Sequence, residues 1–278
     1  MSSFVICQAL FLHFSKFFIP RPFVADLVYN SKKGGGFMEL VDLHCHALFG
    51  VDDGPADLAG ARAILDGAYR GGTRHLCLTP HFNLPLFGDN RTQALTAFLP
   101  LAELAPERWP GLRLYLGNEL RWHPSAPEWL RGGLCRTLNG TRFLLVDFPR
   151  TEAAGTISQA LTTLLELGYR PVLAHAERYE NLRWDLADLR NFRQQGVVIQ
   201  VNAGSLLGGL RRAEAIVEAG LADLAASDSH NLTTRPPSLD EAYRRTARRW
   251  GPETARALFY IKPLELLDSS CTSAPKAL

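Results

Sequence analysis

Two histidines, His44 and His46, stand at the end of an apolar run, and Asp53 follows them closely. Residues two apart on a β-strand point to the same face, so both imidazoles are expected to share one side. Imidazole is the commonest metal ligand among side chains, and a nearby carboxylate adds an oxygen donor. The segment predicts a metal site at a strand end. The alternative is a half-buried strand that carries two unrelated histidines.

Ligand-type residues recur in the same kind of place, directly after apolar runs of strand length. The further members are His81, Glu119, His175, Asp228 and His230. In a parallel α/β barrel the active site is built from residues at the carboxyl ends of the strands. Five of the seven histidines after Met38 occupy such ends, so we expect these side chains to meet in one site.

The positions of the apolar runs predict an α/β fold with a mainly parallel sheet, because strand-like and helix-like segments alternate. The expected strands are 39–44, 75–79, 112–117, 142–147, 171–175, 197–201 and 222–226. The expected helices are 57–71, 91–105, 156–167, 185–195, 211–219, 238–250 and 253–259, with Asp57 as the first N-cap. Seven strands with ligand-type ends favour a (β/α) barrel over an open doubly wound sheet. Neither G-x-G-x-x-G nor G-x-x-x-x-G-K occurs, so no phosphate loop is expected.

The bulk composition is that of a globular protein, with 278 residues, 46% apolar and 21% charged. This length fits a single domain of barrel size. No apolar stretch of about 18 residues occurs, which predicts no stable insertion into a membrane. The five cysteines are odd in number and scattered, which favours a reducing compartment, the cytoplasm. From Met38 onward 26 basic and 27 acidic residues give a net charge of −1, which argues against nucleic acid as a partner.

The first 37 residues differ in composition from the rest of the chain. They hold three of the five lysines and seven of the fifteen phenylalanines, whereas Met38 to Ile261 has no lysine. The run Lys33-Gly34-Gly35 can be encoded by AAG GAG G, a ribosome-binding sequence just before Met38. We therefore predict a doubtful N-terminal extension at 1–37 from a misassigned start, a domain at 38–268 and a tail at 269–278. A real extension or a signal peptide is the alternative, but the sequence lacks the positive start and the cleavage site of a signal peptide.

Taken together, five imidazoles and three carboxylates exceed the needs of one tetrahedral zinc site. The full set is His44, His46, Asp53, His81, Glu119, His175, Asp228 and His230. Such a set suits two or three divalent ions that share a carboxylate, and Mn, Fe and Zn all accept mixed nitrogen and oxygen ligands. Ions about 3.5–4 Å apart can clamp phosphoryl oxygens and lower the pKa of bound water to about 7. The predicted chemistry is metal-assisted hydrolysis, most simply of a phosphate ester.

Two arginines follow candidate ligands closely, Arg178 three residues after His175 and Arg235 five residues after His230. The planar guanidinium suits bidentate contact with phosphate oxygens, so both are predicted to bind the substrate phosphate. Ordinary surface arginines are the alternative.

Two polar residues, Asp52 and Asn202, could orient ligands by hydrogen bonds from behind. Asp52 could equally cap a loop, and Asn202 could be a buried, satisfied amide. Several aromatic residues could line an open mouth or simply pack in the core: Phe82, Phe87, Trp122 and Tyr179.

The resemblance to a known family rests on six motifs. They are D-L-H-C-H-A-L-F-G-V-D-D-G-P, T-P-H, G-N-E-L, L-A-H-A-E-R-Y, Q-V-N and A-S-D-S-H-N-L-T-T-R-P-P. From Met38 to Leu267 the chain resembles the bacterial manganese-dependent protein-tyrosine phosphatases of the PHP (polymerase and histidinol phosphatase) superfamily, which belong to capsule and exopolysaccharide gene clusters. The resemblance implies a cytoplasmic enzyme that acts on a tyrosine autokinase with a tyrosine-rich tail.

The same resemblance implies a distorted (β/α)7 barrel of PHP type that holds three metal ions, with Mn²⁺ expected and Fe or Zn as alternatives. His44, His46, Glu119 and Asp228 would hold one ion. Glu119 would bridge to a second ion, bound also by His175. The third would be held by Asp53, His81 and His230, and the substrate phosphate by Arg178 and Arg235.

A cysteine nucleophile is not expected, because phosphatases of that kind need Cys-x5-Arg. Here Cys45 is followed six residues later by Val51, and Cys135 by Thr141. Attack is therefore predicted from a metal-activated hydroxide in one in-line step, without a phosphoenzyme.

Two other functions remain open from the sequence. One is a PHP phosphatase that acts on a small molecule such as histidinol phosphate. The other is a non-catalytic regulatory module that keeps metals for structure, against which the complete ligand set and both arginines argue.

Overall fold

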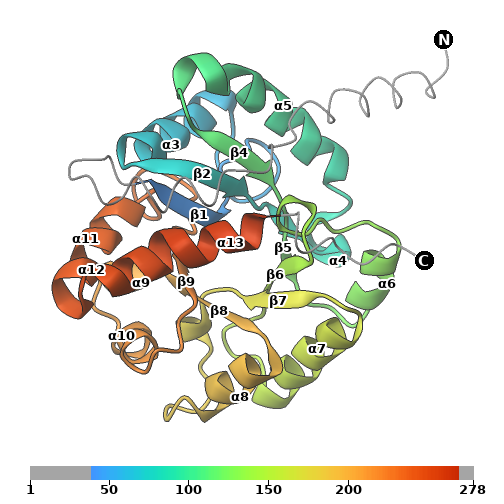
Figure 1. The fold of residues 1–278 in the computed structure, drawn as a ribbon. Coiled ribbons are helices and arrows are strands. Elements are labelled where there is room, and N and C mark those ends of the chain that lie inside the picture. The colour runs from blue at the N-terminus through green and yellow to red at the C-terminus, as the bar shows by residue number, and fades with distance from the viewer. Residues whose placement is uncertain (1–38, 269–278) are drawn as a thin grey trace. The chain divides into compact units, whose positions relative to one another are not determined.

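The computed structural model describes residues 39–268. The predicted extension at 1–37 and the predicted tail at 269–278 lie outside the described residues, so the expected domain boundaries stay a prediction. Within residues 39–268 the helices surround the strands (Figure 1).

All strand pairings among these residues are parallel and fall into two sheets. The first sheet has the order β1 (Leu40–Cys45), β2 (Thr73–Leu78) and β4 (Arg113–Leu116). The second has the order β3 (His81–Phe82), β5 (Glu119–Arg121), β6 (Phe143–Asp147), β7 (Arg170–Leu173), β8 (Val198–Asn202) and β9 (Leu224–Ala226).

The two sheets are parts of one barrel, because β3 continues β2 and β5 continues β4. Proline has no N–H to donate to a neighbouring strand, and Pro80 separates β2 from β3. The pairing nevertheless resumes across the break: the N–H of Gly117 donates to the carbonyl of Leu78 at 2.9 Å, and that of Glu119 to the carbonyl of Pro80 at 3.0 Å.

The ring closes between β9 and β1. The N–H of Asp228 donates to the carbonyl of His44, and the N–H of His46 donates to the carbonyl of Ser229, both at 2.8 Å. Counting β2 with β3 and β4 with β5, seven strand positions close on themselves within the described chain. The predicted distorted (β/α)7 barrel is confirmed.

Each predicted helix is present with its ends shifted by a few residues. The helices are α3 (Leu58–Arg70), α4 (Leu84–Phe87), α5 (Arg91–Arg108), α6 (Ala126–Arg131), α7 (Ala154–Glu166), α8 (Ala187–Gln195), α9 (Ala203–Leu207), α10 (Arg211–Glu218), α11 (Leu239–Trp250), α12 (Pro252–Arg256) and α13 (Lys262–Leu267). Short turns η2 (Leu138–Gly140) and η3 (Ala176–Arg178) and a π-helical turn η4 (Ala257–Ile261) complete the set. The predicted N-cap is correct, because the Asp57 carboxylate accepts the N–H of Gly60 at 2.8 Å. None of the helices within residues 39–268 combines the length and apolar character needed to cross a membrane.

Apolar side chains fill the barrel and the layer between strands and helices. Inside, Val41, Leu145, Val172 and Leu224 come from different strands and are fully buried in one cluster, which Leu266 of α13 joins. Burying a large apolar side chain stabilises the fold by about 1.5–3 kcal/mol, which drives this packing. The packing in turn fixes the strand ends relative to one another.

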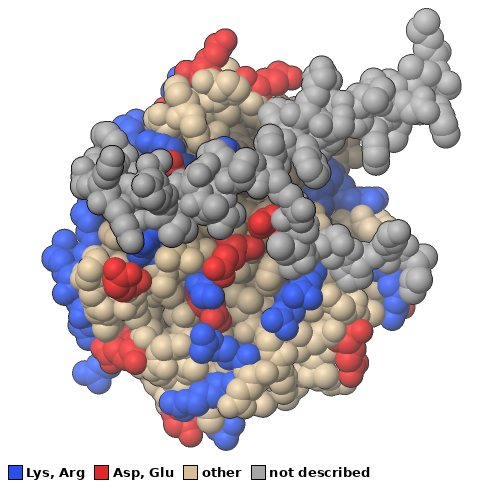
Figure 2. All heavy atoms as spheres, in the orientation of Figure 1, with Lys and Arg blue, Asp and Glu red and all other residues tan. Residues whose placement is uncertain are grey.

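Charged side chains of both signs are interspersed on the described surface (Figure 2). Basic side chains gather along the left edge of that view, where Figure 1 places α11 and α12. Several arginines of α11 are paired with acids: Arg244 with Asp240, and Arg245 with Glu214. These ion pairs offset part of the positive charge of that edge.

Candidate functional site

The barrel brings all eight predicted ligands together at the carboxyl ends of its strands. Together with one further residue they form three groups. In each group every residue offers one nitrogen or oxygen atom, and these atoms lie within 4.8 Å of one another. The groups are His46, Asp53, His81 and His230; His44, His46 and Asp228; and Glu119, Asp147 and His175.

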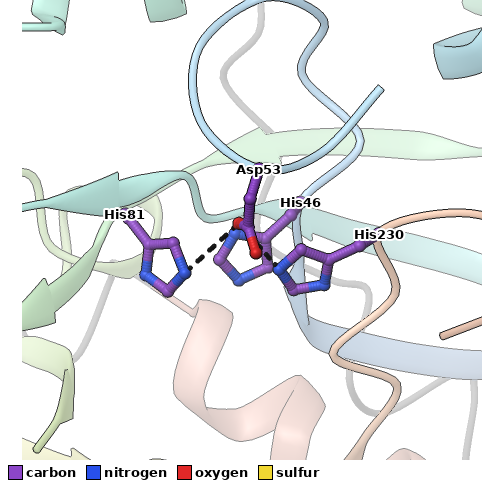
Figure 3. A group of neighbouring side chains, drawn as sticks. All are labelled: His46, Asp53, His81 and His230. Carbon is purple, nitrogen blue, oxygen red and sulfur yellow. Dashed lines mark ion pairs between the residues drawn. The ribbon is translucent and has the colours of Figure 1, made fainter. Parts of the chain in front are cut away.

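The first group is centred on Asp53, in the loop after β1 (Figure 3). Asp53 Oδ1 lies 3.4 Å from His81 Nε2 and 3.2 Å from His230 Nε2. The ring of His46 lies 3.9 Å from that of His230, nearly parallel to it. Three imidazoles and a carboxylate therefore face one small volume, two of them from the loop after β1, one from β3 and one from the loop after β9.

The second group shares His46 with the first and is joined to the third by Glu119. His44 Nε2 lies 3.4 Å from Asp228 Oδ1 and 3.3 Å from Glu119 Oε1. The other oxygen of Glu119 lies 3.2 Å from His46 Nε2, and Oε1 lies 3.1 Å from His175 Nε2. The buried carboxylate of Glu119 thus lies between the groups, where a bridging ligand would be needed.

The third group contains a residue that the sequence reasoning missed, Asp147. Its carboxylate ends β6 and is buried beside Glu119 and His175. One oxygen pairs with Arg121 Nη2 at 3.1 Å, and the other has no hydrogen-bond partner. The signal was available in the sequence, because Asp147 follows an apolar run as the other candidates do.

The site has two features of a cation site: clustered negative carboxylates and buried polar atoms that make no hydrogen bond. Asp147 Oδ1 and His175 Nδ1 are buried and make no hydrogen bond, and Glu119 Oε2 and His81 Nδ1 make none although they lie 2.9 Å apart. Burial opposes a charge on His44, but Glu119 and Asp228 outweigh it and raise the pKa of His44 to about 9. In the same way Glu119 and Asp53 outweigh burial and raise the pKa of His81 to about 11. The buried carboxylates are stabilised by positive charge nearby. Divalent cations bound to the same nitrogen and oxygen atoms would supply that charge in place of protons on the histidines.

The tautomers of His44 and His46 fit metal binding. Gln200 Oε1 lies 3.1 Å from His44 Nδ1 and also accepts the N–H of His175 at 3.0 Å, so it is the amide oxygen and not the nitrogen. Asp52 Oδ2 lies 2.7 Å from His46 Nδ1. Both Nδ1 atoms therefore donate, which leaves each Nε2 as the metal-facing atom. These two Nε2 atoms lie 3.1 Å apart, close enough for both to bind one cation or for a proton on one of them to be shared with the other.

A layer of hydrogen bonds holds the ligands from behind, as such layers do in metal sites. Asp52 also accepts the N–H groups of His81 at 2.9 Å and Gly54 at 3.0 Å. The sequence reasoning proposed orienting roles for Asp52 and for Asn202, and their contacts agree with such roles. Gln200 was missed, although the spacing of Gln200 and Asn202 on β8 places both on one face.

Asn202 connects this layer to Asp228. Its amide nitrogen donates to Asp228 Oδ2 at 2.8 Å, and its oxygen accepts from Gln200 Nε2 at 2.6 Å. Asp228 has a left-handed backbone, φ +53°, and so does His175, φ +35°. This conformation costs about 1–3 kcal/mol in residues other than glycine and occurs mainly at functional sites. The expected strand 171–175 accordingly ends earlier, at Leu173.

Both predicted phosphate-binding arginines reach the same place from separate loops. Arg178 Nη1 lies 3.0 Å from Asp228 Oδ2, and Arg235 Nη2 lies 2.7 Å from Asp53 Oδ2. Both line a cleft of about 710 Å³. The loop that carries Arg235 is folded around Asn231, whose side-chain oxygen accepts the N–H of Arg235 at 3.1 Å. Each guanidinium is partly exposed and is placed to contact an anion in front of the ligands.

Among the aromatic candidates for the mouth, one is placed there. Phe82 and Tyr179 are fully buried, and Trp122 packs against the core. Phe87 of α4 is 37% exposed and stacks on the His81 ring, with centroids 5.2 Å apart. Core packing is therefore the role of Phe82 and Tyr179, while Phe87 forms a wall beside the first group.

The fold matches that of a solved structure. A chain from the crystal structures of YwqE from Bacillus subtilis and CpsB from Streptococcus pneumoniae, described as metal-dependent tyrosine phosphatases, matches with a TM-score of 0.70. The two chains are 28% identical, and the match covers 86% of this chain and 100% of the other.

Sequence comparisons agree with the structural match. The tyrosine-protein phosphatase CpsB of Streptococcus agalactiae serotype III (strain NEM316) is 32% identical over 240 residues, which cover 83% of this chain and 99% of that protein. YwqE of Bacillus subtilis (strain 168), also a tyrosine-protein phosphatase, is 29% identical over 219 residues, 77% of this chain and 86% of that protein. The model of the family described as capsular polysaccharide synthesis, CpsB/CapC, matches residues 40–268. This chain belongs to the CpsB/CapC family.

Proposed function

We propose that this protein is a metal-dependent phosphatase that hydrolyses phosphotyrosine on a protein substrate. The observation that carries the proposal is the juxtaposition of three ligand groups with two arginines at one barrel mouth. The relatives named as tyrosine-protein phosphatases, including the metal-dependent one of known structure, support the same activity. By this proposal the enzyme acts in the control of capsule or exopolysaccharide synthesis.

The metal ligands we propose are the eight predicted residues together with Asp147. His46 belongs to two of the groups, and Glu119 of the third group lies 3.2 Å from it, so neighbouring ions would share ligands. Mixed imidazole and carboxylate ligation suits Mn²⁺, which we propose, and also Fe and Zn. When bound, such ions would lower the pKa of a water and offset charge on the phosphoryl oxygens.

The arginines would bind and orient the phosphate. Arg178 and Arg235 now pair with carboxylates that belong to the ligand set. If those carboxylates held cations, the guanidinium forks would be available to contact the phosphoryl oxygens, whose charge grows in the transition state. The net reaction consumes one water, breaks the phosphorus–oxygen bond to tyrosine, and releases inorganic phosphate.

A thiolate mechanism does not fit the described cysteines. Cys45 and Cys135 are buried, and burial raises the pKa of each thiol above its usual range. Since the thiolate is the nucleophile, both are poorly suited to attack phosphate. Water is therefore the nucleophile in this proposal.

The substrate we propose is a phosphotyrosine in a flexible protein segment, such as the tail of a bacterial tyrosine autokinase. Two features favour a polypeptide over a small metabolite: the open cleft of about 710 Å³ and the partly exposed Phe87 beside the first ligand group. The three described cysteines, Cys45, Cys77 and Cys135, are unpaired, which supports action in the cytoplasm.

Phosphate release distinguishes the candidate substrates. Metal-stripped protein repleted with Mn²⁺ should turn over a phosphotyrosine peptide much faster than histidinol phosphate. His44→Ala should abolish both activities, while His123→Ala, which changes a histidine outside the ligand groups, should retain them. Turnover confined to histidinol phosphate would replace the proposed substrate by a small molecule.

A further inference from the structure

The cleft beside the phosphate site extends well past the two arginines that reach it. At one end it is lined by Arg178, Asp228 and Arg235, and at the other by Trp184, Leu210 and Arg211. Its volume of about 710 Å³ lies in the range of about 300–1,000 Å³ typical of pockets for drug-sized ligands, much larger than a phosphate. The second end therefore has room for a part of the substrate other than the phosphotyrosine.

The lining of this cleft is strongly cationic. It contains the arginines Arg178, Arg211, Arg212 and Arg235, and the single acid among its lining residues is Asp228, a candidate metal ligand. Clefts lined by one sign of charge concentrate ligands of the opposite sign. Two of the arginines serve the phosphate end, so the charge at the far end comes from Arg211 and Arg212.

Both arginines have N–H donors that are not used within the described part of the chain. Arg211 begins α10, is exposed, and forms no ion pair with any residue in the range 39–268. Arg212 is only 3% exposed; its Nη2 donates to the carbonyl of Leu182 at 2.8 Å, while its buried Nε has no partner. Asp188 and Glu177 offset part of the charge of Arg212, so the guanidinium that an anion at this end of the cleft would meet is that of Arg211.

The far end also offers apolar contact. Trp184 is 70% exposed and Leu210 is 43% exposed, unusual for side chains of this size. The guanidinium carbon of Arg212 lies 5.1 Å from the centre of a Trp184 ring, a cation–π contact that helps to hold the indole in place. Gly208 and Gly209 also line the cleft and add no side chains. Rigid exposed aromatic residues next to arginine are typical of peptide-binding surfaces.

We propose that Trp184, Leu210 and Arg211 form a subsite that binds an anionic side chain of the substrate polypeptide close to the phosphotyrosine. The occupant follows from charge complementarity and from the continuity of the subsite with the phosphate end. A glutamate or aspartate carboxylate and a second phosphate share the required chemistry. The inference rests on the proposed function, because it concerns a second part of the same substrate.

The test compares kcat/KM for phosphotyrosine peptides that differ in one residue near the phosphotyrosine: glutamate, glutamine, lysine or a second phosphotyrosine. The glutamate peptide should exceed the glutamine peptide by about 3- to 10-fold, between the effect of an exposed ion pair and that of a charge-assisted hydrogen bond. Arg211→Gln should reduce this ratio to about one, and Arg211→Glu should favour the lysine peptide. Arg248→Gln, which changes an exposed arginine outside the cleft lining, should keep the original ratio.

The outcomes separate the two proposals. An active enzyme with equal kcat/KM for all four peptides would overturn the subsite and leave the phosphatase standing, as would an equal loss of preference in Arg248→Gln. A preference restricted to the doubly phosphorylated peptide would assign phosphate as the anion. If neither the peptides nor para-nitrophenyl phosphate is hydrolysed, the proposed function itself fails, and the subsite with it.

Discussion

Arg178 Nη1 lies 3.0 Å from Asp228 Oδ2, so a candidate phosphate ligand is paired with a candidate metal ligand. Arg235 repeats the relationship with Asp53 at 2.7 Å. In each pair the other oxygen of the carboxylate faces histidines: Asp228 Oδ1 lies 3.4 Å from His44 Nε2, and Asp53 Oδ1 lies 3.2 Å from His230 Nε2. Each carboxylate can therefore offer one oxygen to a cation and position an arginine with the other.

Replacing Arg178 by lysine tests the phosphate role. Lysine keeps the positive charge but loses the planar fork, so Arg178→Lys should lower kcat for a phosphotyrosine peptide by about 10²-fold, the effect typical of losing one oriented donor to the transition state. Bound metal, measured by elemental analysis, should stay at the wild-type level. Arg183→Lys, which changes an exposed arginine paired with Asp188, serves as the control. A wild-type kcat in Arg178→Lys would remove this residue from the account.

Asp147 is expected to hold metal together with Glu119 and His175. Asp147→Asn should bind one fewer ion per chain and lose about 10- to 100-fold in activity, since loss of a contact to a metal centre has effects of that size. Elemental analysis of dialysed protein gives the ion count. Asp89→Asn, at an exposed acid paired with Arg91, should bind the wild-type number of ions. An unchanged ion count in Asp147→Asn would restrict the third group to two protein ligands.

Asp52 is expected to act through His46, whose Nδ1 lies 2.7 Å from its carboxylate. Asp52→Asn retains the size of the side chain but removes its charge, which should weaken metal binding by about 10- to 100-fold. Competition with a fluorescent chelator measures the affinity directly. At saturating metal the variant should regain most of its activity, whereas His46→Ala should not. Failure of excess metal to rescue Asp52→Asn would indicate a role beyond positioning.

The buried His75 predicts a dependence of stability on pH. It lies 2.8 Å from the Tyr115 hydroxyl, and burial, with a smaller contribution from Arg113, lowers its pKa from 6.5 to about 4. The folded state therefore keeps His75 neutral while the unfolded state takes up a proton, so stability is fully present above pH 6.5 and declines as the pH falls toward 4. The shift corresponds to about 3 kcal/mol at 1.36 kcal/mol per pH unit.

Chemical denaturation of metal-free protein at several pH values tests this linkage. The free energy of unfolding of His75→Gln should decline less than that of the wild type between pH 6.5 and 4. His123→Gln, at a histidine for which burial is incomplete, provides the matched comparison. Parallel pH curves for wild type and His75→Gln would show that this histidine is not the linked group.

The sequence predicted the barrel and the gathering of the candidate ligands at one mouth for a single physical reason. The carboxyl ends of parallel strands meet on one side of a barrel, so residues placed there come together however far apart they lie in the chain. This logic located His44, Glu119, His175 and Asp228 correctly at one mouth. The same reasoning applies to Asp147, which also ends a strand. It was not predicted because no histidine lies near it in the sequence.

Other features depend on tertiary contacts that a sequence pattern does not encode. The strands are interrupted near Pro80, so β3 and β5 are separate from β2 and β4. The pairing resumes after this interruption through hydrogen bonds between neighbouring strands. The expected end of the helix at 91–105 was too early, because the helix continues through Pro106 to Arg108. Gln200 looks like an ordinary strand residue until His44 and His175 are placed against it.

The most direct test of the central claim is a titration of metal-stripped protein with Mn²⁺, in which phosphate release from a phosphotyrosine peptide and the number of bound ions are measured on the same samples. We expect negligible turnover without metal and a rise that follows occupancy of more than one site per chain, with His44→Ala inactive at every metal concentration. Undiminished turnover by the metal-free protein, or full activity in His44→Ala, would contradict that claim.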